Sequence, residues 1–257
     1  VRQQLERKYR GLDLVFLLDV TGSMSPWIDI CREKLFSIVE YAKEIQENTV
    51  LRVGFIGYRD YEPSCTQRKP NHFEVFQFVD ETNIASLTKQ IAKVKAIGGN
   101  DFPEDVAGGL SEVLKLKWEA STRLVIHIAD APAHGTKYCD SNDNFPDGDP
   151  NGLDPEKLLE EFCKFKIDYY FCRVGEAKWT QKMTNAFQKV YEKNPSRNYA
   201  VYDVKNDTSA FLPSVIKSVQ SSVRAAAAVR PASDGMDAVI AESSSTAVFW
   251  AKPTDRD

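Results

Sequence analysis

Several features that would place this 257-residue chain in common functional classes are missing from it. The sequence has no apolar run approaching the roughly 18 residues that a membrane helix needs, and its charged amino end is unlike a secretory signal. It also has no basic stripe, and its 33 basic and 37 acidic residues give a formal charge of −4, which disfavours nucleic acid as a partner. We therefore expect a cytoplasmic protein that neither crosses a membrane nor binds nucleic acid.

Motifs of disulfide, zinc and phosphate chemistry are also absent. The five cysteines are odd in number and have no C-x-x-C spacing, so the sequence signals neither a disulfide framework nor a zinc site. It has no P-loop and no G-x-G-x-x-G fingerprint. An aspartate-based phosphotransferase would need a second aspartate where the chain has Thr21. We therefore expect no enzymatic activity, and keep a metal-dependent phosphatase or phosphotransferase as the less favoured alternative.

The pattern of apolar residues predicts a doubly wound α/β fold. Strand-like runs rich in Val, Ile, Phe and Tyr occur at about 12–18, 51–58, 122–129, 167–174 and 199–204. They are apolar on both faces, as in a mainly parallel sheet with helices on both sides. A further run, 73–79, alternates polar and apolar residues and predicts a short antiparallel edge strand. Helices are expected at about 26–47, 84–96, 104–117, 154–165, 178–193 and 209–224. The pairs Ser25-Pro26 and Asp154-Pro155 are typical helix starts.

The predicted elements form a single domain with an extension at each end. We expect an amino-terminal extension over 1–10, the domain over 11–224, and a tail over 225–257. The tail is rich in Ala, Ser and scattered charge, which indicates a disordered or docking segment. Within the domain, the polar stretch 140–152 is long enough to act as a lid or binding loop.

An aspartate and two hydroxyls follow the first apolar run in the pattern Asp19-x-Thr21-x-Ser23. A carboxylate and two hydroxyls on one tight turn suit a hard divalent cation such as Mg²⁺, which takes oxygen ligands. Asp130 ends a later apolar strand, and Asp101 lies in a glycine-rich turn that opens a helix. Ligands of open α/β sheets bind beyond the carboxyl ends of the strands. The five residues together therefore predict a metal site.

Some of these residues, and others near them, also have purely structural interpretations. Asp101 with Glu104 fits a helix N-cap and capping box. Asp60 follows the second strand and is more often half of a solvated ion pair than a ligand. His127, inside an apolar strand, is interpreted as a core histidine, whereas His134 is the better site candidate.

With these motifs the chain resembles a von Willebrand factor A domain over about residues 10–224. In that family a metal-ion-dependent adhesion site combines an Asp-x-Ser/Thr-x-Ser motif, a residue of a Gly-Gly-x-Thr/Asp loop and an aspartate after a later strand. The matching positions here are Asp19, Thr21, Ser23, Asp101 and Asp130. The resemblance implies a site for Mg²⁺, with Mn²⁺ or Ca²⁺ as alternatives, that captures an acidic residue of a protein partner.

Within that family, the segments 53–60, 98–106 and 129–135 are similar to the A domains that accompany eukaryotic α-kinases. The chain departs from that subgroup at Ala133 and Cys139, where a cysteine and a histidine are frequent. As an alternative function, the resemblance implies a targeting or regulatory domain of an α-kinase-like protein, with no kinase domain within this sequence.

Overall fold

A computed structural model describes residues 11–45, 50–63 and 65–229 and contains one six-stranded sheet. The strands are β1 (Gly11–Asp19), β2 (Val50–Tyr58), β3 (Phe73–Asp80), β4 (Thr122–Ala129), β5 (Ile167–Val174) and β6 (Tyr199–Lys205). Their order is β3-β2-β1-β4-β5-β6, and β3 pairs antiparallel with β2 at the edge while the other pairs are parallel. The predicted fold class, including the antiparallel edge strand, is confirmed.

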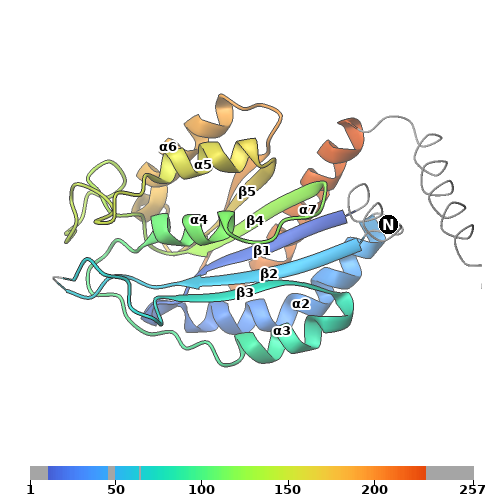
Figure 1. The fold of residues 1–257 in the computed structure, drawn as a ribbon, viewed down its shortest axis with the longest axis horizontal. Coiled ribbons are helices and arrows are strands. Elements are labelled where there is room, and N and C mark those ends of the chain that lie inside the picture. The colour runs from blue at the N-terminus through green and yellow to red at the C-terminus, as the bar shows by residue number, and fades with distance from the viewer. Residues whose placement is uncertain (1–10, 46–49, 64, 230–257) are drawn as a thin grey trace, which may run out of the picture.

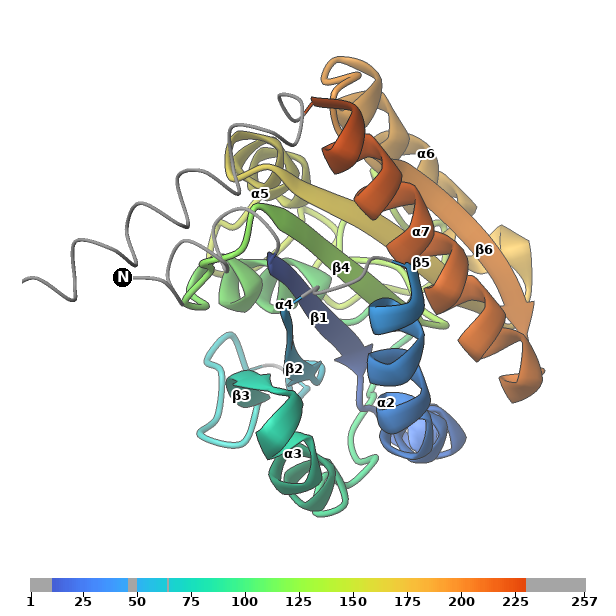
Figure 2. The same ribbon diagram turned by 90° about the vertical axis from the view of Figure 1, so that its right-hand side faces the viewer.

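Helices cover both faces of the sheet (Figures 1 and 2). They are α2 (Ser25–Ile45), α3 (Ile84–Ile91), α4 (Val106–Leu114), α5 (Pro155–Lys164), α6 (Ala177–Glu192) and α7 (Phe211–Val229), with 3-10 turns at Gly22–Met24, Glu81–Asn83 and Thr208–Ala210. Helices α2, α3 and α7 pack on one face, and α4, α5 and α6 on the other. Side chains of Leu14–Leu18 in β1 alternate between these two cores, which explains why that stretch of the strand is apolar.

Helix starts follow the capping chemistry only in part. The prediction at Asp154 is confirmed, because its side chain accepts hydrogen bonds from two backbone N–H groups of α5. The capping box at Asp101 is wrong: α4 is capped by Asp105, whose carboxylate accepts from the Gly108 N–H at 2.7 Å. Ser25 is itself helical, because the 3-10 turn before it runs directly into α2.

The two ends of the chain fall largely outside the described residues. Helix α7 continues to Val229 rather than ending near 224. The predicted extension 1–10 and the remainder of the predicted tail, 230–257, lie outside the described residues, so the domain limits remain a prediction. Among the helices that the structure describes, none is long and apolar enough to cross a membrane.

The sheet order reverses direction at β1, which lies between β2 and β4. At the carboxyl edge of the sheet, backbone hydrogen bonds join the loop after β1 to the end of β2 and to the loop before α4, and the Glu104 N–H of that loop donates to Pro132 O, after β4, at 2.9 Å. The Val20 N–H donates to Tyr58 O at 3.0 Å, and the Ile97 N–H donates to Val20 O at 3.0 Å. The Gly22 N–H donates to Gly98 O at 3.2 Å. The switch point of the sheet, where ligands of such folds bind, is therefore built by three loops.

Candidate metal centre

Asp19 is the central acid of the predicted site and is fully buried at the end of β1. Its Oδ1 accepts hydrogen bonds from the Thr21 N–H at 2.8 Å and from the Thr21 hydroxyl at 2.7 Å. Its Oδ2 has no hydrogen-bond partner. Burial, reinforced by the charge of Asp130, raises the pKa of Asp19 to about 7 against the opposing effect of the Thr21 bonds. The aspartate is thus held rigidly through one oxygen and left unsatisfied at the other.

Glu104 is a second buried acid at this centre, and sequence reasoning assigned it only a capping role. It is 4% exposed, and its Oε2 has no hydrogen-bond partner. Burial and the charges of Asp19 and Asp60 raise its pKa well above the usual range, while a hydrogen bond from Thr21 opposes them. The Thr21 hydroxyl contacts both carboxylates but has one proton, so it can donate to only one of them at a time.

The glycines before Glu104 explain how it reaches Thr21. Gly98 and Gly99 both have positive φ, at 91° and 90°. A Cβ on Gly99 would lie 3.2 Å from the Glu104 carboxylate and 3.5 Å from the Thr21 Cβ. This close approach of loop backbone to two polar side chains requires glycine. The glycine pair was the one signal in the sequence that could have pointed to Glu104.

The other predicted ligands lie in different surroundings. Asp130 is half-buried after β4, and its charge acts on both Asp19 and Glu104. Ser23 is exposed in the 3-10 turn. Asp101 is half-buried and accepts the Asn144 N–H at 2.6 Å. The structure thus brings Asp19, Thr21 and Asp130 together, and places Asp101 in a neighbouring cluster.

That neighbouring cluster combines two aspartates and a histidine. Asp60, Asp101 and His134 each offer one ligand atom, and these atoms lie within 4.8 Å of one another, a grouping that could hold a metal ion. The Asp60 side chain is 1% exposed, so its interpretation as half of a solvated ion pair is wrong. Burial raises the pKa of Asp101, and the charge of Asp60 adds to that effect.

His134 lies between two carboxylates. Its Nε2 is 2.9 Å from Asp60 Oδ1, and its Nδ1 is 2.8 Å from Asp143 Oδ1. Burial lowers the pKa of His134, but the hydrogen bonds and charges of the two aspartates outweigh it and raise the value to about 9. His127 is different: it is fully buried between the hydroxyls of Tyr58 and Tyr169, and burial lowers its pKa to about 3. The interpretation of His127 as a core histidine is confirmed.

The loop 140–152 folds back over this end of the sheet. Asp143 contacts His134, and the neighbouring Asn144 N–H contacts Asp101. Asp149 accepts hydrogen bonds from the Tyr61 hydroxyl at 2.8 Å and from Arg68 at 2.9 Å. The loop is therefore anchored by polar contacts on both sides of the cluster.

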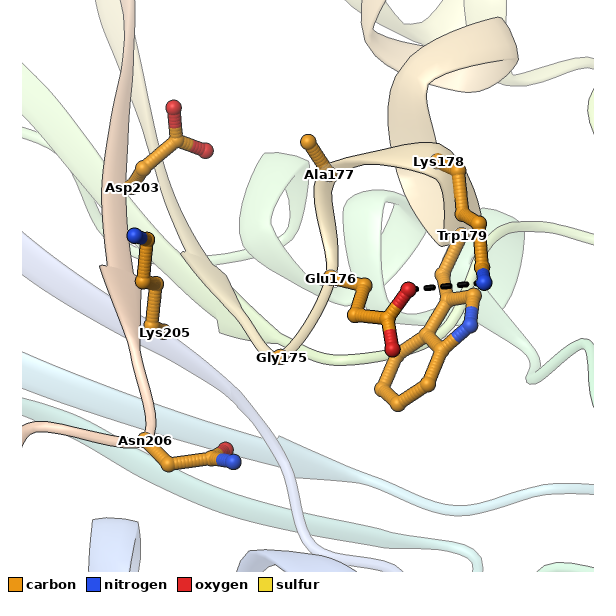
Figure 3. A pocket seen from close by; sticks show the side chains of 8 residues that line it. All are labelled: Gly175, Glu176, Ala177, Lys178, Trp179, Asp203, Lys205 and Asn206. Atoms are coloured by element: carbon orange, nitrogen blue, oxygen red, sulfur yellow. Dashed lines mark ion pairs between the residues drawn. The ribbon is translucent and has the colours of Figure 1, made fainter.

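A pocket of about 520 Å³ lies beyond the ends of β5 and β6, next to the first turn of α6 (Figure 3). Trp179 forms one wall, and Glu176 and Lys178 pair at its rim. The Trp179 ring also packs edge to face with Phe102, the residue after Asp101, at 6.0 Å between centroids. The pocket thus adjoins the loop of the candidate centre without being lined by its acids.

Two curated proteins of much greater length are similar to this chain in sequence. It is 38% identical over 188 residues to alpha-protein kinase vwkA of Dictyostelium discoideum, which covers 73% of this chain and 29% of the kinase. It is 30% identical over 137 residues to putative ariadne-like RING finger protein R811 of Acanthamoeba polyphaga mimivirus, which covers 52% of this chain and 12% of that protein. The chain therefore spans less than a third of the length of either relative. No protein-family model matches it.

Solved structures share the fold at low sequence identity. Proximal thread matrix protein 1 of the mussel byssus superposes with a TM-score of 0.54 at 14% identity, covering 82% of this chain and 46% of that chain. The pilus adhesin SpaC of Lactobacillus rhamnosus GG gives 0.55 at 13% identity, covering 82% and 30%. BatB of Bacteroides thetaiotaomicron gives 0.51 at 12% identity, covering 84% and 99%. The shared fold and the α-kinase relative are consistent with a domain of the von Willebrand factor A type.

Proposed function

We propose that the chain is a Mg²⁺-dependent protein-binding module with an adhesion-type metal centre. The observation that supports this most directly is a pair of buried carboxylate oxygens, Asp19 Oδ2 and Glu104 Oε2, without hydrogen-bond partners. Unpaired buried acceptors are costly, and the charges of Asp60 and Asp130, which act on both acids, are also negative. A divalent cation would satisfy both oxygens and offset this repulsion, so the residues present fit a metal.

The proposed ligands are oxygen donors from three loops: Asp19, Thr21, Ser23, Asp130 and either Glu104 or Asp101. Glu104 has the stronger claim to the last position, because its carboxylate contacts Thr21 whereas Asp101 contacts Asp60 and His134. An all-oxygen set of carboxylates and hydroxyls favours Mg²⁺, with Mn²⁺ or Ca²⁺ as alternatives.

The protein-binding part of the proposal follows from the adhesion-type resemblance. In such a centre one position of the cation stays open, and here it would take an aspartate or glutamate of a protein partner. Trp179 supports an interface at this edge, because it is 36% exposed and packs beside Phe102. Aromatic residues are enriched among the anchors of protein interfaces.

Calorimetric titration of Mg²⁺ and Mn²⁺ into EDTA-treated protein tests the metal part. Asp19→Asn and Glu104→Gln should abolish or strongly weaken binding, because each removes a charged ligand. Glu161→Gln is the matched control, since this glutamate lies on α5 and pairs with Lys164 away from the centre. If Glu104→Gln binds like the control, Asp101 takes the last position, and Asp101→Asn should then weaken binding. Unchanged affinity in Asp19→Asn would contradict the site.

Affinity capture with and without EDTA tests the protein-binding part. Partners should be retained in Mg²⁺, released by EDTA, and absent from an Asp19→Asn column. Retention that is equal under all three conditions would contradict metal-dependent capture. Incubation with a generic phosphoester and Mg²⁺ tests the phosphatase alternative. Hydrolysis by the wild-type chain that is lost in Asp19→Asn would support that alternative.

The α-kinase relative supports a second proposal, that the module targets or regulates an α-kinase-like protein. The similarity covers most of this chain but 29% of the kinase, so it carries no statement about catalysis in this chain. Binding of the purified chain to an α-kinase catalytic domain, measured with and without Mg²⁺, tests this proposal. Absence of binding under both conditions would contradict it.

A further inference from the structure

We propose a second metal site, formed by Asp60, Asp101 and His134, that binds a late first-row divalent ion such as Zn²⁺. It lies beside the proposed Mg²⁺ centre, and the two sites share no ligand when Glu104 rather than Asp101 completes that centre. The three ligand atoms come from the loop after β2, the loop before α4 and the loop after β4. They lie within 4.8 Å of one another.

One distance within the cluster matches direct coordination, and the third ligand atom lies within 4.8 Å of the other two. Bonds of about 2.0–2.2 Å from nitrogen or oxygen to Zn²⁺, at angles between a right angle and tetrahedral, place neighbouring ligand atoms about 2.9–3.4 Å apart. The 2.9 Å between His134 Nε2 and Asp60 Oδ1 falls in this range. Two aspartates and one histidine would fill three positions of a tetrahedral ion and leave the fourth for water or a ligand.

Two orphaned carboxylate oxygens point to an ion rather than to a complete ion pair. Asp60 Oδ2 and Asp101 Oδ1 are buried and have no hydrogen-bond partner, although both residues stand beside His134. One imidazolium can neutralise one of the three carboxylates around it, those of Asp60, Asp101 and Asp143. The cluster therefore holds more negative charge than the histidine offsets, and unsatisfied acceptors remain.

The surroundings of His134 already have the form of an outer coordination shell. Its Nδ1 faces Asp143 Oδ1 at 2.8 Å, which leaves Nε2 directed at Asp60. Asp143 is itself fixed, because its carboxylate accepts the Gly135 N–H at 2.6 Å and the Phe145 N–H at 2.8 Å. A carboxylate behind a ligating histidine orients the ring and raises its basicity as a ligand.

The identity of the donors decides the class of metal. Imidazole suits Zn²⁺, Cu²⁺ and Ni²⁺, whereas Mg²⁺ prefers oxygen donors and retains its waters. Asp60 also lines a cavity of about 280 Å³ that residues of 59–63, 67–72 and 97–100 form. The proposed Mg²⁺ centre, in contrast, contains only oxygen ligands. The two sites should therefore prefer different cations, Zn²⁺ at the cluster with His134 and Mg²⁺ at the centre with Asp19.

Competition for Zn²⁺ against a chromogenic chelator, in EDTA-treated protein returned to excess Mg²⁺, tests this site. The wild-type chain should bind one equivalent of Zn²⁺. His134→Gln and Asp60→Asn should lose it, and Asp143→Asn should weaken it about 10–100-fold, as expected for an outer-shell carboxylate. In the wild-type protein, the ring resonances of His134 should shift on addition of Zn²⁺ while those of the core His127 do not.

Two matched variants separate this site from general effects and from the Mg²⁺ centre. His127→Gln removes a buried histidine outside the cluster and should retain Zn²⁺. Asp19→Asn should lose Mg²⁺ and retain Zn²⁺, so failure of one site is distinguishable from failure of the other. The proposal is overturned if the wild-type chain binds no Zn²⁺ in excess Mg²⁺. It is equally overturned if Zn²⁺ leaves the His134 resonances in place, a readout that does not depend on any variant folding.

Discussion

Replacing Asp19 by asparagine should stabilise the metal-free protein, although it removes a proposed ligand. Asparagine keeps the shape of the side chain and the oxygen that accepts two hydrogen bonds from Thr21. It removes a negative charge that is fully buried and is repelled by Asp130. The ionised acid therefore destabilises the metal-free fold, and a bound cation would offset that cost.

The magnitude follows from the pKa of Asp19, which is about 7 in the folded protein and 3.8 ordinarily. Ionising the buried carboxylate costs up to about 4 kcal/mol of folding free energy once the pH exceeds 7. Because the folded-state value is raised, this cost is absent below pH 3.8 and grows between those two values. We expect Asp19→Asn to raise the free energy of unfolding by about 1–4 kcal/mol at about pH 8 in EDTA.

Urea unfolding in EDTA and in saturating Mg²⁺ measures this effect. Asp168→Asn is the matched control, because Asp168 is also buried but accepts hydrogen bonds from Asn198 and Ser222, so its loss should destabilise. Mg²⁺ should stabilise the wild-type protein and leave Asp19→Asn unchanged. If Asp19→Asn were destabilised in EDTA as much as Asp168→Asn, the buried charge would not carry the penalty described.

Three further predictions concern other parts of the domain. Because burial depresses the pKa of His127 to about 3, the native state resists its protonation, and acidification from about pH 7.5 to pH 5 should remove about 2 kcal/mol of stability that His127→Gln does not lose. Gly175→Ala should cost about 1–3 kcal/mol and alter Trp179 fluorescence, because Gly175 has φ 72° and its added Cβ would lie 2.4 Å from the indole. Asp105→Ala should lower the free energy of unfolding, measured in urea, by about 3–5 kcal/mol, because it removes a buried helix cap that also pairs with Arg68 and His72. The same substitution at the ordinary cap Asp154 should cost about 1 kcal/mol.

The strands were predictable because the pattern of apolar residues within each strand indicates how it is buried. β1 and β4 contain long apolar runs, which follow from burial between two helical layers, whereas β3 is an edge strand without a fully buried residue and alternates polar with apolar side chains. The helix starts were less predictable. Asp101 and Asp105 both precede α4, and the choice between them depends on Arg68 and His72, which reach Asp105 from a distant loop.

The candidate centre was predictable where its residues share one turn, and less so where loops converge. Asp19 and Thr21 are two positions apart, and their contact follows from a local turn. Glu104 and Asp60 become site residues only through tertiary contacts, with Thr21 and His134 respectively. No local pattern distinguishes such an acid from a helix cap or a surface charge, so the sequence left both in structural roles.

The contacts of the loop 140–152 imply that metal binding should change how often this loop opens. Its Asp143 and Asn144 contact His134 and Asp101, so opening the loop removes support from both of these proposed ligands of the second site. Loop opening and ion binding are then thermodynamically linked, and each weakens the other by the same factor. An ion that tightens the site should slow amide exchange in the loop and protect it from proteases. The rate at which proteases cleave this loop would therefore depend on the concentration of the metal ion around the protein.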